Sequence, residues 1–250
     1  MPVMDEFKEE RESLKHGTFK QKFSYFCDYY KWHVIVTIAA TVFVISLIVQ
    51  IVTRKDIVFY AAVINGLEMP NATEYVQSFA EYAGVDTDKN QVLLDASLHL
   101  NFSVLDQQTI GSSQKLVAYI AGRDVDVFIG DETVMESYAN NETFHDLSKF
   151  LSPEQYTKCE PYFYYIDQAV VDEKMAAQKT MNNDYIAQYP DPRNPEAMRN
   201  PVPVGIYLDN TQALKDNYYY EEDKDIILSV VANTERPETT SKFIDFLLDN

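Results

Sequence analysis

The sequence predicts an α/β protein that carries a single transmembrane helix. Two observations lead to this fold class. The stretch 34–52 contains no charged residue, no proline and no glycine. After it, segments of strand character alternate with segments of helical periodicity. That order favours a mostly parallel sheet with helices on both of its faces.

The apolar stretch 34–52 is long enough to cross a membrane. At about 1.5 Å per residue, a helix of this length spans most of a hydrocarbon core of roughly 30 Å. Trp32 precedes it and Arg54 and Lys55 follow it, which suits anchors at the membrane surface. A cleaved signal peptide has a shorter apolar core and a small-residue cleavage site, whereas a buried core helix is a further alternative. We predict an uncleaved signal-anchor helix over residues 32–52.

The charges beside this helix predict its orientation. The flank before it carries four lysines and one aspartate within about 20 residues of the membrane, and positively charged flanks stay inside. We therefore expect a cell-membrane protein with one span. Residues 1–31 form its cytoplasmic tail, and residues 53–250 form an α/β domain outside the cytoplasm.

The tail has two features of its own. Residues 5–15 are expected to form a helix that breaks at Gly17. Aromatic residues at 23, 26, 29 and 30 then recur at three- and four-residue spacing, as on one face of a helix. This face either anchors the membrane helix or binds a partner, and the sequence leaves both alternatives open.

The charge distribution excludes one class of partner. Residues 1–33 hold six basic and six acidic residues, so the net charge of −18 lies entirely after the membrane segment. An acidic surface repels phosphates, and we expect no nucleic-acid binding. Cys27 and Cys159 fall on opposite sides of the predicted membrane, so they cannot form a disulfide within one chain.

Three strand–helix units follow the membrane segment. The first strand is a continuous apolar run, as expected for a strand covered on both faces. Asn71 is predicted to cap the first helix, with Glu74 in the capping-box position, and Gly84 and Gly122 are predicted to end the first two helices. The predicted strands are 57–65, 91–100 and 126–130, and the predicted helices are 71–83, 113–122 and 132–140.

The rest of the chain is less regular. Ser152 and Pro153 are expected to open a short helix, and Pro237 is expected to begin the last one. Five of the ten prolines fall within 188–203, which predicts a loop. The acidic segment 218–225 is expected to be exposed. The predicted strands are 162–171, 204–210 and 226–233, and the predicted inward side chains of the last helix are Thr239, Phe243, Phe246 and Leu247.

Two acidic residues, Asp131 and Glu132, follow the third predicted strand. Parallel sheets place ligands at the carboxyl ends of their strands, near a topological switch point. The alternative is structural, because Asp131 can cap the next helix while Glu132 complements the helix dipole. The two roles are compatible with each other.

The order of segments in 119–151 resembles that of extracellular solute-binding proteins with the type 2 periplasmic-binding fold. A helix ending at Gly122 leads to a strand between Asp126 and Gly130, followed by Asp131, a helix and a turn at 144–147. The ending ILSVVANTERPETTSKFIDFLL resembles the signature of their C-terminal lobe. The resemblance covers about 57–155 and 203–250, and it implies one lobe of that fold.

Three departures accompany this resemblance. The second lobe of such proteins needs well over a hundred residues, whereas residues 156–205 leave room only for a reduced lobe or an insertion. Their Gram-positive members are typically lipid-anchored, and this chain has a predicted membrane helix. Its N-terminal segment is similar to that of uncharacterised single-pass membrane proteins of Gram-positive anaerobes.

The resemblance implies a non-catalytic module that binds a small solute or peptide. Aromatic rings would cover apolar or sugar faces of the ligand, and acids would favour a cationic one. Core packing is the alternative role for the tyrosines. The predicted ligand-binding residues are Asn65 and Glu68 after the first strand, Asp131 and Glu132 after the third, and Tyr164, Tyr165 and Asp167 where crossover segments pass.

Motifs of catalysis and metal binding are missing from the sequence. It contains no nucleophile elbow, zinc-protease motif, P-loop, dinucleotide fingerprint or paired-cysteine motif. The segment from Asp86 begins like a calcium loop, but Gln91 and Ser97 stand where that loop needs Gly and Glu. We expect no enzyme, cofactor or metal. The alternative to solute binding is an interaction subunit that docks another membrane protein, such as a transporter or a secretion complex.

Overall fold

The computed structural model describes residues 18–104, 106–182, 184–209, 211–221 and 224–249, without the side chains of 21, 22 and 24–30. Contacts divide the chain into two compact units, Met1–Arg54 and Lys55–Asn250. The helix predicted over residues 5–15 lies outside the described residues.

The described part of the first unit is one long helix, α2 (Phe19–Val52), which includes the aromatic segment of the tail. Its portion Lys31–Val52 is strongly apolar, and no residue in the most apolar 18-residue stretch of this portion is buried. A helix of this length and composition can cross a membrane as an anchor, and a signal sequence near the N-terminus has the same properties.

The second unit is built on a six-stranded sheet with the order β3-β1-β4-β8-β6-β5. Strand β1 pairs in parallel with β3 and β4, whereas the pairs β4–β8, β8–β6 and β6–β5 are antiparallel. The strands are β1 (Asp56–Val63), β3 (Asn90–Asp95), β4 (Val127–Asp131), β5 (Phe163–Asp167), β6 (Pro201–Tyr207) and β8 (Ile226–Val230).

The sheet is therefore mixed, and the prediction of a mostly parallel sheet is wrong for its second half. For the β5–β6 pair, the cause lies in the connection between the two strands. After β5 the chain runs out along helix α8 (Gln168–Lys179) and returns through residues 180–200. Strand β6 then starts where β5 ends, with Pro201 opposite Asp167, so the two strands run in opposite directions.

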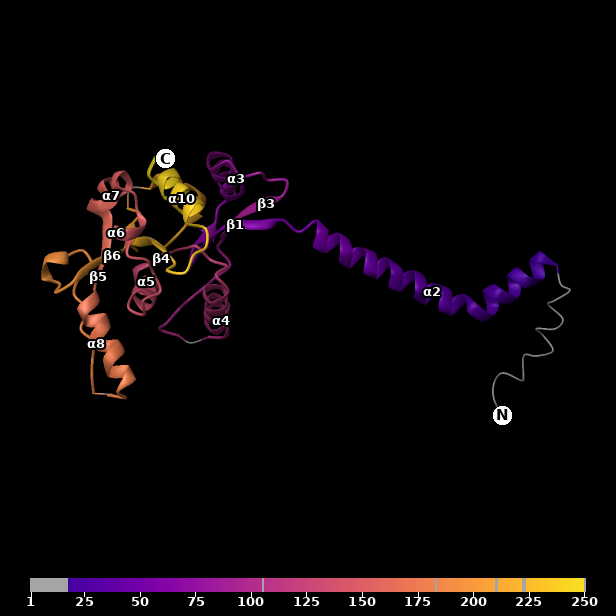
Figure 1. The fold of residues 1–250 in the computed structure, drawn as a ribbon, viewed down its shortest axis with the longest axis horizontal. Coiled ribbons are helices and arrows are strands. Elements are labelled where there is room, and N and C mark those ends of the chain that lie inside the picture. The colour runs from indigo at the N-terminus through magenta and orange to yellow at the C-terminus, as the bar shows by residue number, and fades with distance from the viewer. Residues whose placement is uncertain (1–17, 105, 183, 210, 222–223, 250) are drawn as a thin grey trace. The chain divides into compact units, whose positions relative to one another are not determined.

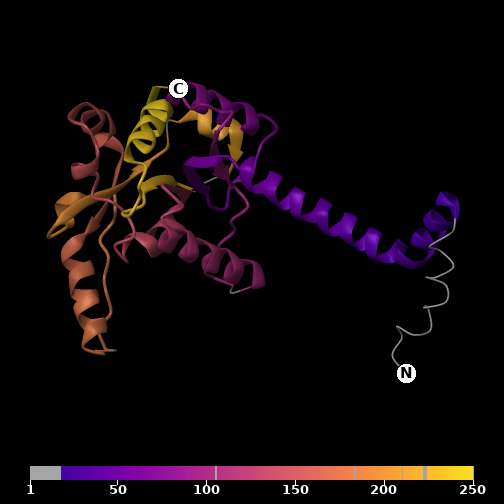
Figure 2. The same ribbon diagram turned by 45° about the vertical axis from the view of Figure 1, so that its right-hand side comes forward.

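Helices cover both faces of the sheet, as predicted, and β1 is buried between them (Figure 1). One face carries α3 (Ala72–Ala83), α6 (Leu147–Phe150), α7 (Pro153–Cys159) and α10 (Pro237–Asp249). The other carries α4 (Gln107–Gly122), α5 (Glu132–Ala139) and α8. Helix α10 lies beside α3 in both ribbon views (Figures 1 and 2).

Several smaller elements complete the unit. Strands β2 (Leu67–Glu68) and β7 (Tyr218–Tyr219) form a separate antiparallel ribbon. Helix α9 (Gln212–Asn217) precedes β7 along the chain. The two 3₁₀ turns are η1 (Glu160–Tyr162) and η2 (Pro195–Ala197).

Residues 156–205 contribute to this same sheet. They supply β5 and most of β6, and between them α8 packs Val171 against the second face. The segment is thus part of the sheet rather than a separate reduced lobe. The strand predicted over 162–171 ends at Asp167, because the carboxylate of that residue caps α8. Pro201 and Pro203 lie within β6 rather than in the predicted loop.

Several helix ends follow the local sequence as predicted. Gly84 takes the left-handed conformation (φ 72°) that ends α3, where a residue without Cβ is least strained. Ser152 and Gln155 form a reciprocal capping box at the start of α7. Pro237 is the first residue of α10.

Three local predictions are wrong. The side chain of Asn71 makes no capping hydrogen bond, so the capping box predicted with Glu74 does not form. Helix α4 ends through Arg123 in the left-handed conformation (φ 59°), and Gly122 is its last helical residue. The strand predicted over 91–100 stops at Asp95, because the following residues turn toward the end of β1.

Cys159 gives a test of this packing. It is the last residue of α7 and is fully buried, and burial raises the pKa of its thiol to about 11. Since the thiolate is the reactive form, a Cys27→Ser variant of the full chain should react with a thiol reagent at pH 8 about 100-fold more slowly than free cysteine. Denaturant should restore the normal rate. Rapid labelling of the folded protein would contradict this packing.

Candidate functional site

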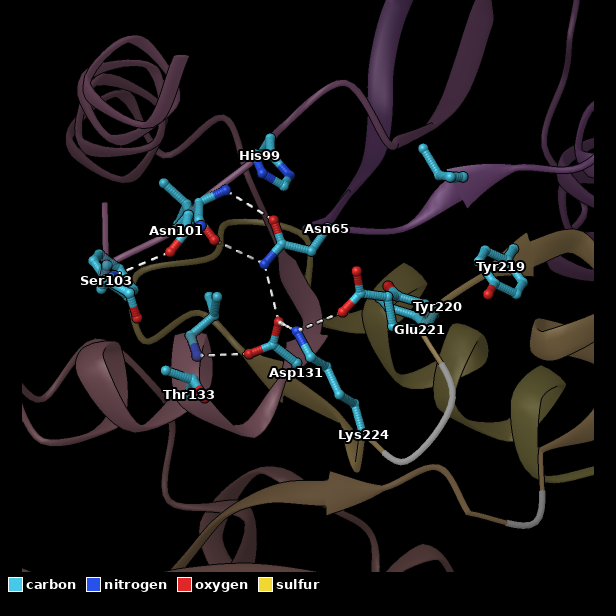
Figure 3. A pocket seen from close by; sticks show the side chains of 14 residues that line it. Asn65, His99, Asn101, Ser103, Asp131, Thr133, Tyr219, Tyr220, Glu221 and Lys224 are labelled. Carbon is cyan, nitrogen blue, oxygen red and sulfur yellow. Dashed lines mark hydrogen bonds and ion pairs between the residues drawn. The ribbon is translucent and has the colours of Figure 1, made fainter. Parts of the chain in front are cut away.

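A hollow of about 320 Å³ opens at the carboxyl ends of β1 and β4 (Figure 3). Strand β1 leads to α3 on one face of the sheet, and β4 leads to α5 on the other. The two connections diverge here, so this is the topological switch point at which α/β sheets bind ligands. Two of the predicted ligand-binding residues, Asn65 and Asp131, line it.

The side chain of Asn65 joins three segments at the floor of this hollow. Its Nδ2 donates to the carbonyl of Leu100 and to Oδ2 of Asp131, both at 2.9 Å. Its Oδ1 accepts from the backbone N–H of Leu100 at 2.8 Å. Asn65 adopts φ 62°, a left-handed conformation that Asn tolerates better than most residues. These bonds fix the residues after β3 to the ends of β1 and β4.

Asp131 fulfils the capping role predicted for it and lines the hollow, while ligand binding stays a prediction. Its Oδ1 accepts from the backbone N–H of Val134 at 3.1 Å, so it caps α5. Its Oδ2 accepts from Asn65 and lies 3.6 Å from Nζ of Lys224. The side chain is only 4% exposed. Asp131 and Asn65 therefore shape the hollow, and most of their polar atoms are already occupied.

Two charged residues that the sequence reasoning missed lie at this hollow, Lys224 and Glu221. Nζ of Lys224 lies 3.6 Å from Asp131 and 3.5 Å from Oε2 of Glu221, which is longer than a strong charged hydrogen bond. The ammonium therefore keeps donors for a ligand. Both residues come from the acidic segment 218–225, whose composition predicts only exposure.

The remaining lining is partly apolar. Leu67, Phe102 and Tyr219 line the hollow, yet they are 64%, 40% and 47% exposed. They come from β2, from the residues after β3 and from β7. Exposed apolar side chains gathered at one opening are a feature of binding sites. The switch-point hollow, defined by this lining, thus combines a paired positive and negative charge with an apolar rim.

A second hollow, of about 160 Å³, contains four other predicted residues, Glu132, Tyr164, Tyr165 and Asp167. Ile166, residues 189–192 of the loop before β6, and Glu136 and Asn140 of the α5 segment complete its lining. Among the described residues, no basic side chain lines it. We call it the tyrosine hollow.

Asp167 serves the fold in this hollow. Its buried carboxylate accepts from the backbone N–H groups of Ala169, Arg199 and Asn200 at 3.0–3.1 Å. Burial alone would raise the pKa of Asp167, but these three donors outweigh it and lower the pKa. Its charge is therefore balanced internally, and it fastens the start of α8 to the residues before β6.

Glu132 is the predicted residue that keeps free acceptor capacity. Its Oε1 accepts one hydrogen bond, from the hydroxyl of Tyr207 at 3.3 Å. Burial raises the pKa of Glu132 above that of an ordinary glutamate, although the Tyr207 hydroxyl opposes this. Arg193 stacks on the ring of Tyr207, with Cζ 3.5 Å from the ring centroid.

The structure does not bring Glu68 together with the other predicted residues. This residue lies exposed on β2, pairs across the ribbon with Tyr218 and lines neither hollow. After β1 the chain enters the separate β2–β7 ribbon, which carries Glu68. Within the described residues, no group of three His, Cys, Asp or Glu residues could hold a metal ion.

The fold class alone does not identify a function. A sheet with helices on both faces and a switch-point hollow occurs in proteins of many activities. The resemblance to extracellular solute-binding proteins accordingly stays a prediction. No protein-family model, no curated protein and no solved structure matches this chain.

Proposed function

We propose that this chain is a single-pass cell-membrane protein that binds a small solute or peptide outside the cytoplasm. Helix α2 anchors it, residues 1–31 form the cytoplasmic tail, and the α/β domain over residues 53–250 carries the site. The observation that supports binding best is the switch-point hollow, where Asn65 and Asp131 hold the strand ends together around about 320 Å³.

The side chains of this hollow suggest the class of solute. The ammonium of Lys224 and the carboxylate of Glu221 lie side by side, so they complement a ligand that carries both charges. The apolar rim at Leu67, Phe102 and Tyr219 suits an attached side chain. An amino acid or a short peptide has this chemistry. We propose binding without catalysis, because Asn65 and Asp131 are held in internal hydrogen bonds.

The exposed apolar rim also favours a second candidate function. Leu67, Phe102 and Tyr219 would fit a complementary surface of another membrane protein, such as a transporter or a secretion complex. In that case the chain is an interaction subunit, and the hollow receives a side chain of the partner instead of a free solute.

Thermal unfolding of the full chain in detergent micelles tests the proposal that the protein binds a small solute or peptide. We expect one member of a panel of amino acids, dipeptides and sugars to stabilise the protein. At about 100 times its dissociation constant, such a ligand adds roughly 2.7 kcal/mol, a shift of about 5–10 °C for a domain of this size. The variant Lys224→Met should lose most of this shift.

The matched control is Lys179→Met, which removes an exposed lysine at the end of α8, outside both hollows. It should keep the full shift. If no compound stabilises a chain that unfolds cooperatively, solute binding is ruled out for this panel and the interaction subunit becomes the better proposal. A shift that survives Lys224→Met would place the ligand elsewhere.

A further inference from the structure

The side chain of Tyr164 is the unexplained feature of the tyrosine hollow. The residue is only 1% exposed, and its ring contacts that of Tyr207 with centroids 5.7 Å apart. Tyr164 lines the hollow, and its hydroxyl has no hydrogen-bond partner among the described residues. This hydroxyl is not one of the fully buried polar atoms that lack a partner, so it is accessible and can bond to a ligand that enters the hollow.

The charges around this hydroxyl favour a cation. Burial raises the pKa of Tyr164 most, and the carboxylates of Glu136 and Glu132 raise it further. Glu136 is exposed and has no ion pair within the described part of the chain. Two acids thus lie close to one unpaired hydroxyl.

The nearby basic side chains are already engaged. Arg193 pairs with Asp209 and Asp225, at 3.1 and 2.9 Å. Arg199 pairs with Glu173 at 2.6 Å.

The ammonium of Lys174 is engaged in the same way. It donates to the carbonyl of Asn140 and to Oδ1 of Asn141 at 3.0 and 2.9 Å. Asp167 of the tyrosine hollow lies 3.8 Å from Nε of Arg199, whereas Glu132 and Glu136 form no ion pair within the described part of the chain.

The walls of the hollow suit a flat cation. Tyr164 and Tyr189 line it, and aromatic rings attract cations. The ring of Tyr165 packs on the opposite face of the sheet, against that of Phe163. Guanidinium groups stack on aromatic rings more readily than ammonium groups do, and they bind carboxylates with a planar fork. Arg193 already stacks on a tyrosine in this way, with its guanidinium 3.5 Å from the centroid of the Tyr207 ring.

We propose that the tyrosine hollow binds a guanidinium group, free or on an arginine side chain. Glu132 and Glu136 accept its N–H groups, the Tyr164 hydroxyl accepts another, and the tyrosine rings cover its face. The volume of about 160 Å³ suits one such group rather than a whole solute. This site goes beyond the switch-point hollow, because it uses different residues and another ligand chemistry.

Titration calorimetry of the full chain in micelles tests the proposal, with methylguanidinium as the probe at constant ionic strength. N-methylurea has the same shape without the charge, and methylammonium has the charge without the planar fork. We expect methylguanidinium to bind at least about 10-fold more tightly than either. Equal binding of N-methylurea or of methylammonium would overturn the proposal.

Two variants tie the binding to this hollow. Glu132→Gln and Tyr164→Phe should each weaken methylguanidinium binding about 10-fold, while Glu81→Gln, on the exposed side of α3, should leave it unchanged. Unfolding without ligand reports whether each variant is folded. Glu132→Gln should be no less stable than the wild type, because burial disfavours the charge of Glu132. Folded variants that bind like the wild type would overturn the proposal.

Two further titrations separate the sources and the sites. Free arginine and N-acetyl-arginine methylamide distinguish a free ligand from a peptide one. Binding of either supports the guanidinium site, and failure of both overturns it. Lys224→Met should not alter methylguanidinium binding, so failure at the switch-point hollow is distinguishable from failure here.

Discussion

Replacing Arg236 with methionine is expected to lower the free energy of unfolding by about 3–5 kcal/mol, the range for breaking a buried ion pair. Nε of Arg236 donates to Oδ1 of Asp126 at 3.0 Å, and Asp126 is fully buried. The other guanidinium N–H groups donate to the carbonyls of Ile57, Arg123 and Asp124. Methionine replaces most of the volume, but it leaves the buried carboxylate without a counter-ion.

The matched control is Lys158→Met, which breaks an exposed pair with Asp249 and should cost less than about 1 kcal/mol. Chemical denaturation of the full chain at pH 7 measures both variants. Equal losses of unfolding free energy in Arg236→Met and Lys158→Met would show that the buried ion pair does not stabilise this end of the sheet.

The pH dependence gives a second check of the same pair. Burial raises the pKa of Asp126 in the folded state above its unfolded value, despite its hydrogen bonds to Thr234, Tyr60 and Arg236. A group with a raised pKa stabilises the fold below its unfolded pKa, and this contribution is lost as the pH rises. Removing the guanidinium of Arg236 takes away the counter-ion of Asp126, so it raises the pKa of that carboxyl further. The loss in free energy of unfolding caused by Arg236→Met should therefore be smaller at pH 4 than at pH 7.

The parallel half of the sheet could be predicted because its signals are local. Strand β1 is an apolar run buried on both faces, and β4 is a short apolar run that ends in Gly130 and Asp131. The helices behind them carry an apolar stripe or a terminating glycine. Each signal lies within about a dozen residues, which is the range that periodicity reports.

The second half depends on contacts that a single segment does not reveal. Val170 and Val171 extend the strand-like run after β5, yet they belong to α8 and pack inward. The carboxylate of Asp167 decides between the two structures, because it caps α8 and binds the backbone of residues 199–200. The bonds to residues 199 and 200 join positions more than 30 apart, and they hold the start of β6 beside the end of β5, as the antiparallel pairing requires.

The candidate site shows the same division. Asp131 was predictable, because a strand end and a helix cap coincide at one acidic residue. Lys224, Glu221 and Tyr189 lie in irregular segments, and only the fold brings them to the hollows. The residues that were predicted to form one site lie in two hollows. Asp131 lines the switch-point hollow, whereas its neighbour Glu132 lines the tyrosine hollow.

The second large effect is expected for Phe243→Ala in α10. Phe243 is fully buried, and its ring centroid lies 4.7 Å from that of Phe59 in β1 and 4.9 Å from that of Phe79 in α3. This cluster joins α10 and α3 to the sheet. Truncating a buried phenylalanine to alanine leaves a cavity and costs about 3–5 kcal/mol. Chemical denaturation of the full chain measures the loss.

The conservative variant Phe243→Leu keeps most of the volume and should cost less than about 1.5 kcal/mol, as volume-conserving core changes do. A loss below about 1 kcal/mol for Phe243→Ala would mean that α10 does not depend on this ring. The folded variant should also bind methylguanidinium like the wild type, because α10 covers the face of the sheet opposite α5 and α8. Weaker binding would show that the tyrosine hollow depends on packing across the whole sheet, so its geometry could not be attributed to Glu132 and Tyr164 alone.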